Sequence, residues 1–230
     1  MKNLLNEEIC SYLFKHPPAL KLYKKLEKAG HIYLIGGVLR EYRDKKEIQD
    51  IRDIDIVLDV KRDEYWEMIL ENYRPRRNKF GGYKIICDGL IVDMWRLQET
   101  WAYKNNVITC SQSEYLRMLP YTVFLNLDAI VYDVKENTWY DEKYKQAMQD
   151  KVIDVVLEQN PEVMLNIVRT FVLKKKYNMV LSEKLKDIIK EQKKIHKNFL
   201  NDLLNIQFYR YKKEILTKEE ISIELERIGV

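Results

Sequence analysis

The feature that most constrains this chain is a pair of adjacent glycines, Gly36 and Gly37, at the end of an apolar run. The β-branched, aromatic and aliphatic residues at 32–35 predict a strand that stops at a tight turn. The two apolar residues after the glycines predict the first turn of a helix. Glycines let a backbone approach a ligand closely, and a helix N-terminus offers N–H groups to an anion. The sequence therefore predicts a turn suited to a phosphate group.

A pair of carboxylates follows in residues 53–60, which predict a second strand. Asp53 and Asp55 are two positions apart, so both side chains leave the same face of that strand. Two carboxylates side by side repel each other unless a cation lies between them. We therefore expect a metal ion beside the predicted phosphate-binding turn.

A third acid lies in a predicted β-hairpin. Residues 83–87 and 90–95 are apolar runs on either side of Asp88-Gly89, a dipeptide favoured in two-residue turns. Asp93 stands in the second run, where an unpaired carboxylate is costly to bury. Asp53, Asp55 and Asp93 could together hold two Mg²⁺ ions, one activating an attacking hydroxyl and one steadying a leaving pyrophosphate. The alternative is that all three are solvated residues at strand ends.

These motifs resemble the nucleotidyltransferase superfamily, and most closely the head and neck of bacterial-type tRNA CCA-adding enzymes and poly(A) polymerases. That family carries an apolar strand, Gly-Gly, two residues, Arg-Asp and then Asp-x-Asp. Gly36, Gly37, Arg40, Asp53 and Asp55 match this pattern, whereas Glu41 stands at the family's Asp. The resemblance covers residues 32–177. It implies an α+β, polymerase-β-like head, built as a mixed sheet with flanking helices, followed by an all-helical C-terminal region.

The resemblance also implies roles for residues further along the chain. Residues 93–96 resemble the third-acid strand, residues 125–133 are similar to the family's Phe-Thr-Ile-Asn-Ala stretch, and residues 160–169 resemble the start of its neck helix. The nucleotide-binding residues that it implies are Gly36, Gly37, Arg40, Arg96, Asn160 and Arg169. NTP is the implied substrate, and Mg²⁺ is the implied cofactor.

Two departures from the family pattern bear on specificity. Residues 119–124 carry no charge, although the family has Arg-Arg-Asp there. The family's base-reading Asp and Arg fall on Asn160 and Val163, and a valine side chain cannot hydrogen-bond a base. We therefore expect the transfer chemistry to be kept and the ordered addition of C, C and A to be lost.

Composition favours a globular protein, with 46% hydrophobic and 33% charged residues. No run of 18 apolar residues occurs, which predicts that no helix spans a membrane. Three widely spaced cysteines indicate reduced thiols and a cytoplasmic setting. The three histidines show no metal-ligand spacing.

The C-terminal part of the chain is locally basic. Residues 171–213 contain 12 Lys or Arg and 4 Asp or Glu, interleaved with aromatic residues that could stack on bases. The lysines with which we expect RNA to interact are Lys174, Lys175, Lys176, Lys193 and Lys194. Alternatively, these lysines are the solvated faces of amphipathic helices.

We expect a nucleotidyltransferase head in residues 1–150 and a helical, neck-like domain in residues 151–230. The leading hypothesis is Mg²⁺-dependent transfer of a nucleoside monophosphate from an NTP to RNA, at a tRNA 3′ end. A second hypothesis keeps this chemistry but uses a small-molecule or protein hydroxyl, because aminoglycoside-type nucleotidyltransferases share the Gly-Gly turn and the Arg-Asp-x-Asp strand. A third is a catalytically silent RNA-binding relative.

Overall fold

The computed structural model describes residues 4–49 and 51–230. The chain forms two compact units. The head comprises Met1–Thr122 and Asp128–Glu142, and the C-terminal unit comprises Val123–Leu127 and Lys143–Val230. The expected division at residue 150 stays a prediction.

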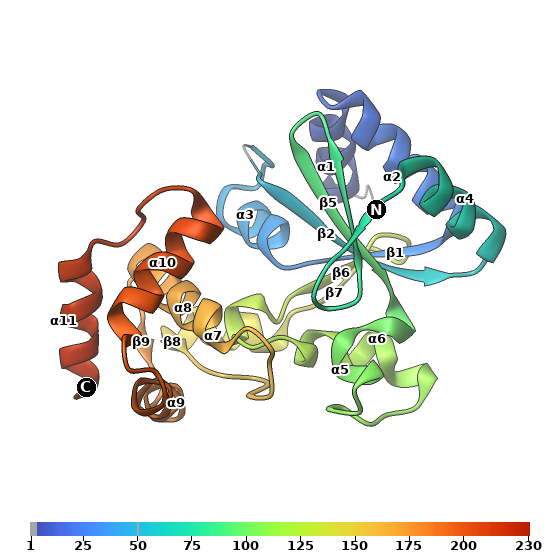
Figure 1. Cartoon of the computed structure of the whole chain (residues 1–230). Coiled ribbons are helices and arrows are strands. Elements are labelled where there is room, and N and C mark those ends of the chain that lie inside the picture. The colour runs from blue at the N-terminus through green and yellow to red at the C-terminus, as the bar shows by residue number, and fades with distance from the viewer. Residues whose placement is uncertain (1–3, 50) are drawn as a thin grey trace. The chain divides into compact units, whose positions relative to one another are not determined.

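The head is built on a mixed sheet of seven strands in the order β3-β4-β5-β2-β1-β6-β7 (Figure 1). Every neighbouring pair is antiparallel except β2 and β5, which are parallel. The predicted mixed sheet is therefore confirmed. The strands are β1 (Gly30–Ile35), β2 (Asp53–Val60), β3 (Arg76–Arg77), β4 (Tyr83–Cys87), β5 (Leu90–Arg96), β6 (Val131–Asp133) and β7 (Thr138–Tyr140).

The helices of the head are α1 (Leu4–Phe14), α2 (Pro17–Ala29), α3 (Gly37–Lys45), α4 (Asp63–Tyr73), α5 (Trp101–Lys104) and α6 (Tyr115–Met118). Helix α2 packs on β1, α1 and α4. The predicted strand before the glycines, the helix after them and the hairpin around Asp88-Gly89 are all confirmed. Asp88 and Gly89 have φ angles of 48° and 83°, as a two-residue hairpin turn requires.

Alternation along β2 separates the two faces of the sheet. Ile54, Ile56 and Leu58 are buried on the face that the helices α2 and α4 cover. Val57 lies on the opposite face with Asp53 and Asp55, because their positions differ by two. Val57 belongs there to a second apolar cluster, which also contains Tyr33, Leu97, Tyr103, Leu119 and Val131. Both faces are thus packed, and the acids occupy the end of one face.

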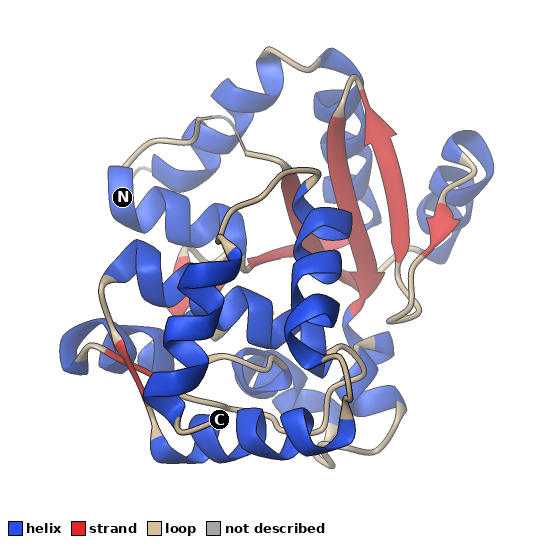
Figure 2. Cartoon of the chain, turned by 60° about the vertical axis from the view of Figure 1, so that its left-hand side comes forward, coloured by secondary structure: helices blue, strands red, loops and turns tan. Residues whose placement is uncertain are grey.

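The C-terminal unit is mainly helical (Figure 2). Its helices are α7 (Glu142–Asp150), α8 (Val163–Tyr177), α9 (Glu183–Ile195), α10 (Phe199–Tyr211) and α11 (Lys218–Ile228). The strands β8 (Val152–Ile153) and β9 (Val180–Leu181) form a short parallel pair in this unit, so the region predicted to be all-helical also contains two short strands. Among the helices of the described residues, none is long and apolar enough to cross a membrane.

The sequence also predicts a helix that begins at Pro161, since proline is favoured at the first helical position, and a strand pair region over residues 125–134. The structure corrects the bounds of both. Helix α8 begins at Val163 and not at Pro161, because the Asn160 side chain accepts a hydrogen bond from the Glu162 backbone N–H and holds a turn there. Residues 125–130 form no paired strand apart from a single bridge between Leu125 and Val155. They contain a short 3₁₀ turn, Asn126–Asp128, before β6 begins.

All three cysteines are free thiols, as the sequence predicts. Cys87 is buried, and Cys10 is half-buried. Desolvation raises the pKa of both thiols above the ordinary value. Neither thiol is therefore activated as a nucleophile.

A buried glutamine closes the connection between α10 and α11. The Gln207 side chain donates to the Leu216 carbonyl at 2.7 Å and accepts from the backbone N–H groups of Ile215 and Leu216 at 3.2 and 3.0 Å.

Replacing Gln207 with Leu should lower the free energy of unfolding by about 2–4 kcal/mol, because backbone groups stay buried without partners. Urea unfolding measures this effect. The exposed Gln159 is the control, and an equal loss in Gln159→Leu would contradict the assignment.

Candidate active site

The glycine turn lies directly against one of the acids. Gly36 has a φ of 73°, in the left-handed region, and Gly37 is the first residue of α3. A Cβ built on Gly36 would lie 3.2 Å from Oδ2 of Asp55. The end of β1, the N-terminus of α3 and this carboxylate therefore meet at one point of the head.

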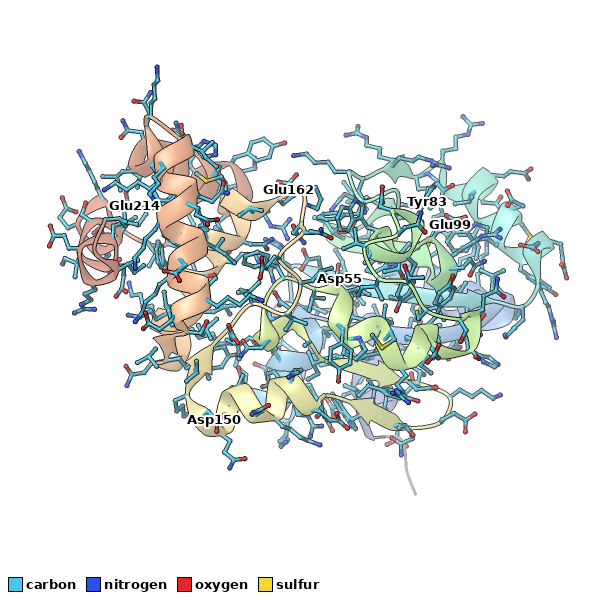
Figure 3. The ribbon with its side chains drawn as sticks, turned by 90° about the horizontal axis from the view of Figure 1, so that it is seen from below. Asp55, Tyr83, Glu99, Asp150, Glu162 and Glu214 are labelled. Atoms are coloured by element: carbon cyan, nitrogen blue, oxygen red, sulfur yellow. The ribbon has the colours of Figure 1, made fainter. Side chains whose placement is uncertain are left out.

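The structure brings the three predicted acids to one face of the sheet. Asp55 and Asp93 are direct partners on the parallel strands β2 and β5. Asp53 is two residues before Asp55 on the same strand and therefore shares its face. Figure 3 labels Asp55, on β2. Neighbouring strands are roughly 4.8 Å apart, so Asp55 and Asp93 are adjacent like charges.

Two of these carboxylates have basic partners. The Arg52 guanidinium donates to Oδ2 of Asp53, with Nε at 3.0 Å. The Lys84 ammonium lies 2.7 Å from Oδ2 of Asp93. Asn78 orders the turn before β4 by accepting hydrogen bonds from the backbone N–H groups of Phe80 and Gly82. Lys84 was not among the predicted site residues, although the register of the predicted hairpin places it opposite Asp93.

The donor chemistry of these acids suits magnesium, which prefers carboxylate oxygens. Within residues 4–49 and 51–230, no three His, Cys, Asp or Glu side chains converge closely enough to hold a metal ion. The side chains of Asp53 and Asp93 are directed to Arg52 and Lys84 instead. A metal site formed by Asp53, Asp55 and Asp93 stays a prediction, and it requires these two basic groups to give way.

Helix α3 is tied to the last part of the head by two ion pairs. Arg40 pairs with Asp128, and both side chains are largely buried. Arg43 pairs with the buried Asp141, and its guanidinium carbon lies 3.8 Å from the centroid of the Trp139 ring. These contacts fix the helix whose N-terminus begins at Gly37.

The structure does not bring Arg96 to the acids. Arg96 is three residues after Asp93 on β5 and therefore points to the opposite face of the sheet. There it pairs with Asp63 and Glu67 of α4 at 2.8 and 3.2 Å. Its guanidinium also lies 5.4 Å from the Trp66 ring. The nucleotide-binding role that the resemblance implies for Arg96 stays a prediction.

The remaining predicted nucleotide-binding residues are in the C-terminal unit. Asn160 accepts hydrogen bonds through Oδ1 from the Glu162 backbone N–H at 3.0 Å and from the Asn166 side-chain amide at 2.9 Å. Val163 is the first residue of α8, and the half-buried Arg169 follows Asn166 by one turn of that helix. With its oxygen engaged, Asn160 offers a ligand its amide N–H groups.

The five predicted RNA-binding lysines fall into two groups, three on α8 and two on α9. Lys174 and Lys175 on α8 form ion pairs with Glu224 and Glu220 of α11, at 2.7 and 2.6 Å. Lys176 lies over the Tyr177 ring, with its ammonium 4.7 Å from the centroid. Lys193 and Lys194 are exposed in the last turn of α9. The second group presents its charge to solvent, whereas Lys174 and Lys175 join two helices.

A side chain at Gly36 should disturb both the turn and the neighbouring acid. Gly36→Ala should lower NTP affinity by about tenfold or more, because the Cβ crowds Asp55 and a positive φ is strained for alanine. Equilibrium binding of a fluorescent NTP measures this loss. Gly81→Ala is the matched control, since Gly81 has a φ of 84° with nothing within 4 Å of a built Cβ. Equal losses in both variants would mean that strain alone is responsible.

Comparison with known proteins gives structural similarity at low sequence identity. A CCA-adding enzyme in complex with CTP matches with a TM-score of 0.63 and 16% identity, over 98% of this chain and 54% of that one. The Thermotoga maritima CCA-adding enzyme complexed with tRNA matches with a TM-score of 0.62 and 17% identity, over 99% and 53%. A tRNA nucleotidyltransferase complexed with a primer tRNA and an ATP analogue matches with a TM-score of 0.55 and 20% identity, over 86% and 56%.

No protein-family model matches the chain, and no curated protein sequence matches it. The chain spans about half the length of the solved structures that it matches. At these identities the similarity concerns the course of the backbone. The fold of this chain is therefore similar to the fold of about half of each of these solved structures.

Proposed function

We propose that this chain is a Mg²⁺-dependent nucleotidyltransferase that moves a nucleoside monophosphate from an NTP to a hydroxyl group of RNA, at a tRNA 3′ end. The observation that carries the proposal is that Asp55 and Asp93 are cross-strand neighbours on β2 and β5, and that Asp55 lies beside the Gly36-Gly37 turn. This arrangement combines a phosphate-binding backbone with clustered carboxylates. The fold shared with tRNA nucleotidyltransferases supports it.

In the proposed reaction, the N-terminus of α3 and the three acids of the head would have separate roles. The N-terminus of α3 orients the triphosphate through backbone N–H groups, since the helix dipole favours an anion there. Asp53, Asp55 and Asp93 hold the metal. When bound, Mg²⁺ neutralises developing charge on the phosphoryl oxygens and favours attack by a hydroxyl group. The close approach of Gly36 to Asp55 keeps phosphate and carboxylates in one place.

Base selection should differ from the C, C, A pattern. Val163 offers no hydrogen bond, and Asn160 presents its amide donors because its oxygen is engaged within the C-terminal unit. An amide donor pairs with acceptor atoms on a base, which all four bases carry. We therefore propose relaxed or shifted use of the four NTPs.

Incubation with each labelled NTP, Mg²⁺ and total RNA tests the proposal. We expect incorporation with at least one nucleotide, and Asp55→Asn should reduce it by about 100-fold or more, because a metal ion contributes several kcal/mol to the transition state. The matched control is Asp59→Asn, on the same strand and the same face but paired with Lys61. Absence of incorporation with all four nucleotides, or near-normal activity of Asp55→Asn, would refute the proposal.

A small-molecule or protein hydroxyl is the second candidate acceptor. The pairing of Lys174 and Lys175 with Glu224 and Glu220 favours it, since these lysines already have anionic partners within the unit. An enzyme for small acceptors should bind RNA weakly and with little dependence on salt. RNA binding therefore separates the two candidates.

The two lysine groups should respond differently when RNA affinity is measured against salt concentration. Each lost phosphate contact lowers the slope of log affinity against log salt by about 0.7–0.9. Replacing Lys193 and Lys194 with Gln should lower it by about 1.5 in total, while NTP affinity stays unchanged. Replacing Lys174 and Lys175 with Gln should change the slope less and should reduce thermal stability instead. An unchanged slope in both variants would favour the small acceptor.

A further inference from the structure

A row of charged residues crosses the sheet at the candidate metal site. In strand order, the row contains Asp55 on β2, Asp93 on β5, Lys84 on β4 and Arg76 on β3. Each residue is the direct cross-strand partner of the next, so all four side chains leave the same face. Two negative positions are thus followed by two positive ones.

Lys84 is held within this row by its neighbours on both sides. Its ammonium lies 2.7 Å from Oδ2 of Asp93, and the Asp93 side chain is only 11% exposed. A buried carboxylate without a countercharge is costly. Arg76, opposite Lys84 on the other side, is exposed and carries a like charge, which favours an orientation of Lys84 toward Asp93.

We propose that Lys84 is a positioning residue that occupies the cation position at Asp93 whenever no divalent ion is bound there. A divalent ion at Asp53 and Asp55 would in turn displace the exposed Arg52 guanidinium from Asp53. Binding of an ion at Asp93 would require displacement of the Lys84 ammonium. Lys84 therefore sets how tightly the site takes a second ion, and it keeps the adjacent acids stable in the protein without metal. This inference rests on the proposed function only for the identity of these acids as metal ligands.

Binding of Mn²⁺ in the absence of NTP and RNA tests this competition, because the electron paramagnetic resonance signal of free Mn²⁺ reports binding directly. Lys84→Met should bind a second Mn²⁺ at least about tenfold more tightly than the unaltered protein, since a positive charge beside the ligand is removed. Arg76→Met is the matched control, because it removes a positive charge from the same row without touching Asp93. Its affinities should stay within about threefold of the unaltered protein.

A double-mutant cycle separates local pairing from the general effect of charge. In an Asp93→Asn background, Lys84→Met should no longer change Mn²⁺ affinity, because no carboxylate remains for Lys84 to occupy. A change of equal size in that background, or in Arg76→Met, would overturn the proposal. So would identical Mn²⁺ binding by Lys84→Met and the unaltered protein.

Thermal stability gives a second readout. With EDTA present, Lys84→Met should melt at a lower temperature than the unaltered protein, and Mn²⁺ should restore more stability to the variant than to the unaltered protein. If Lys84→Met does not fold, Lys84→Gln can be used, since its amide still reaches a carboxylate but carries no charge. If Lys84 competes with Mn²⁺ for Asp93 but the protein transfers no nucleotide, only the proposed function is refuted. If the protein transfers nucleotides but Lys84→Met binds Mn²⁺ as the unaltered protein does, only this inference is refuted.

Discussion

The candidate site depends on one pairing, the parallel alignment of β2 with β5 in a sheet that is otherwise antiparallel. This alignment makes Asp55 and Asp93 direct neighbours and so creates a repulsion that the head must offset. The hairpin that carries Asp93 also supplies Lys84, so the countercharge arrives on the adjacent strand. The position of Lys84 at this end of the sheet therefore offsets the repulsion between two adjacent carboxylates.

The sequence predicts the local parts of the site well because local rules determine them. The Asp88-Gly89 turn also determines the partner of Asp93. A two-residue turn pairs Cys87 with Leu90, and three positions further along each strand the same register pairs Lys84 with Asp93. The contact between Gly36 and Asp55 could not be obtained in this way. It depends on the register of β1 against β2, which distant packing decides.

Elsewhere, the differences between sequence and structure come from interactions that a pattern does not contain. The strand β9 has two residues, and each pairs with a β8 residue 28 positions earlier. A strand of this length is too short to show a period. The delayed start of α8 follows from the side chain of Asn160, which replaces the first helical turn with a turn of its own. The opposite orientation of Arg96 follows from strand alternation once the bounds of β5 are known.

For the phosphate binding that we propose at the N-terminus of α3, the two ion pairs of this helix have a thermodynamic consequence. Arg40 and Arg43 are one turn apart and are anchored to Asp128 and Asp141, and Trp139 lies against Arg43. A helix restrained at both arginines has little freedom to reorient its N-terminal amides when an anion arrives. The cost of ordering this turn is then met during folding, so that less of the binding free energy is lost to conformational entropy.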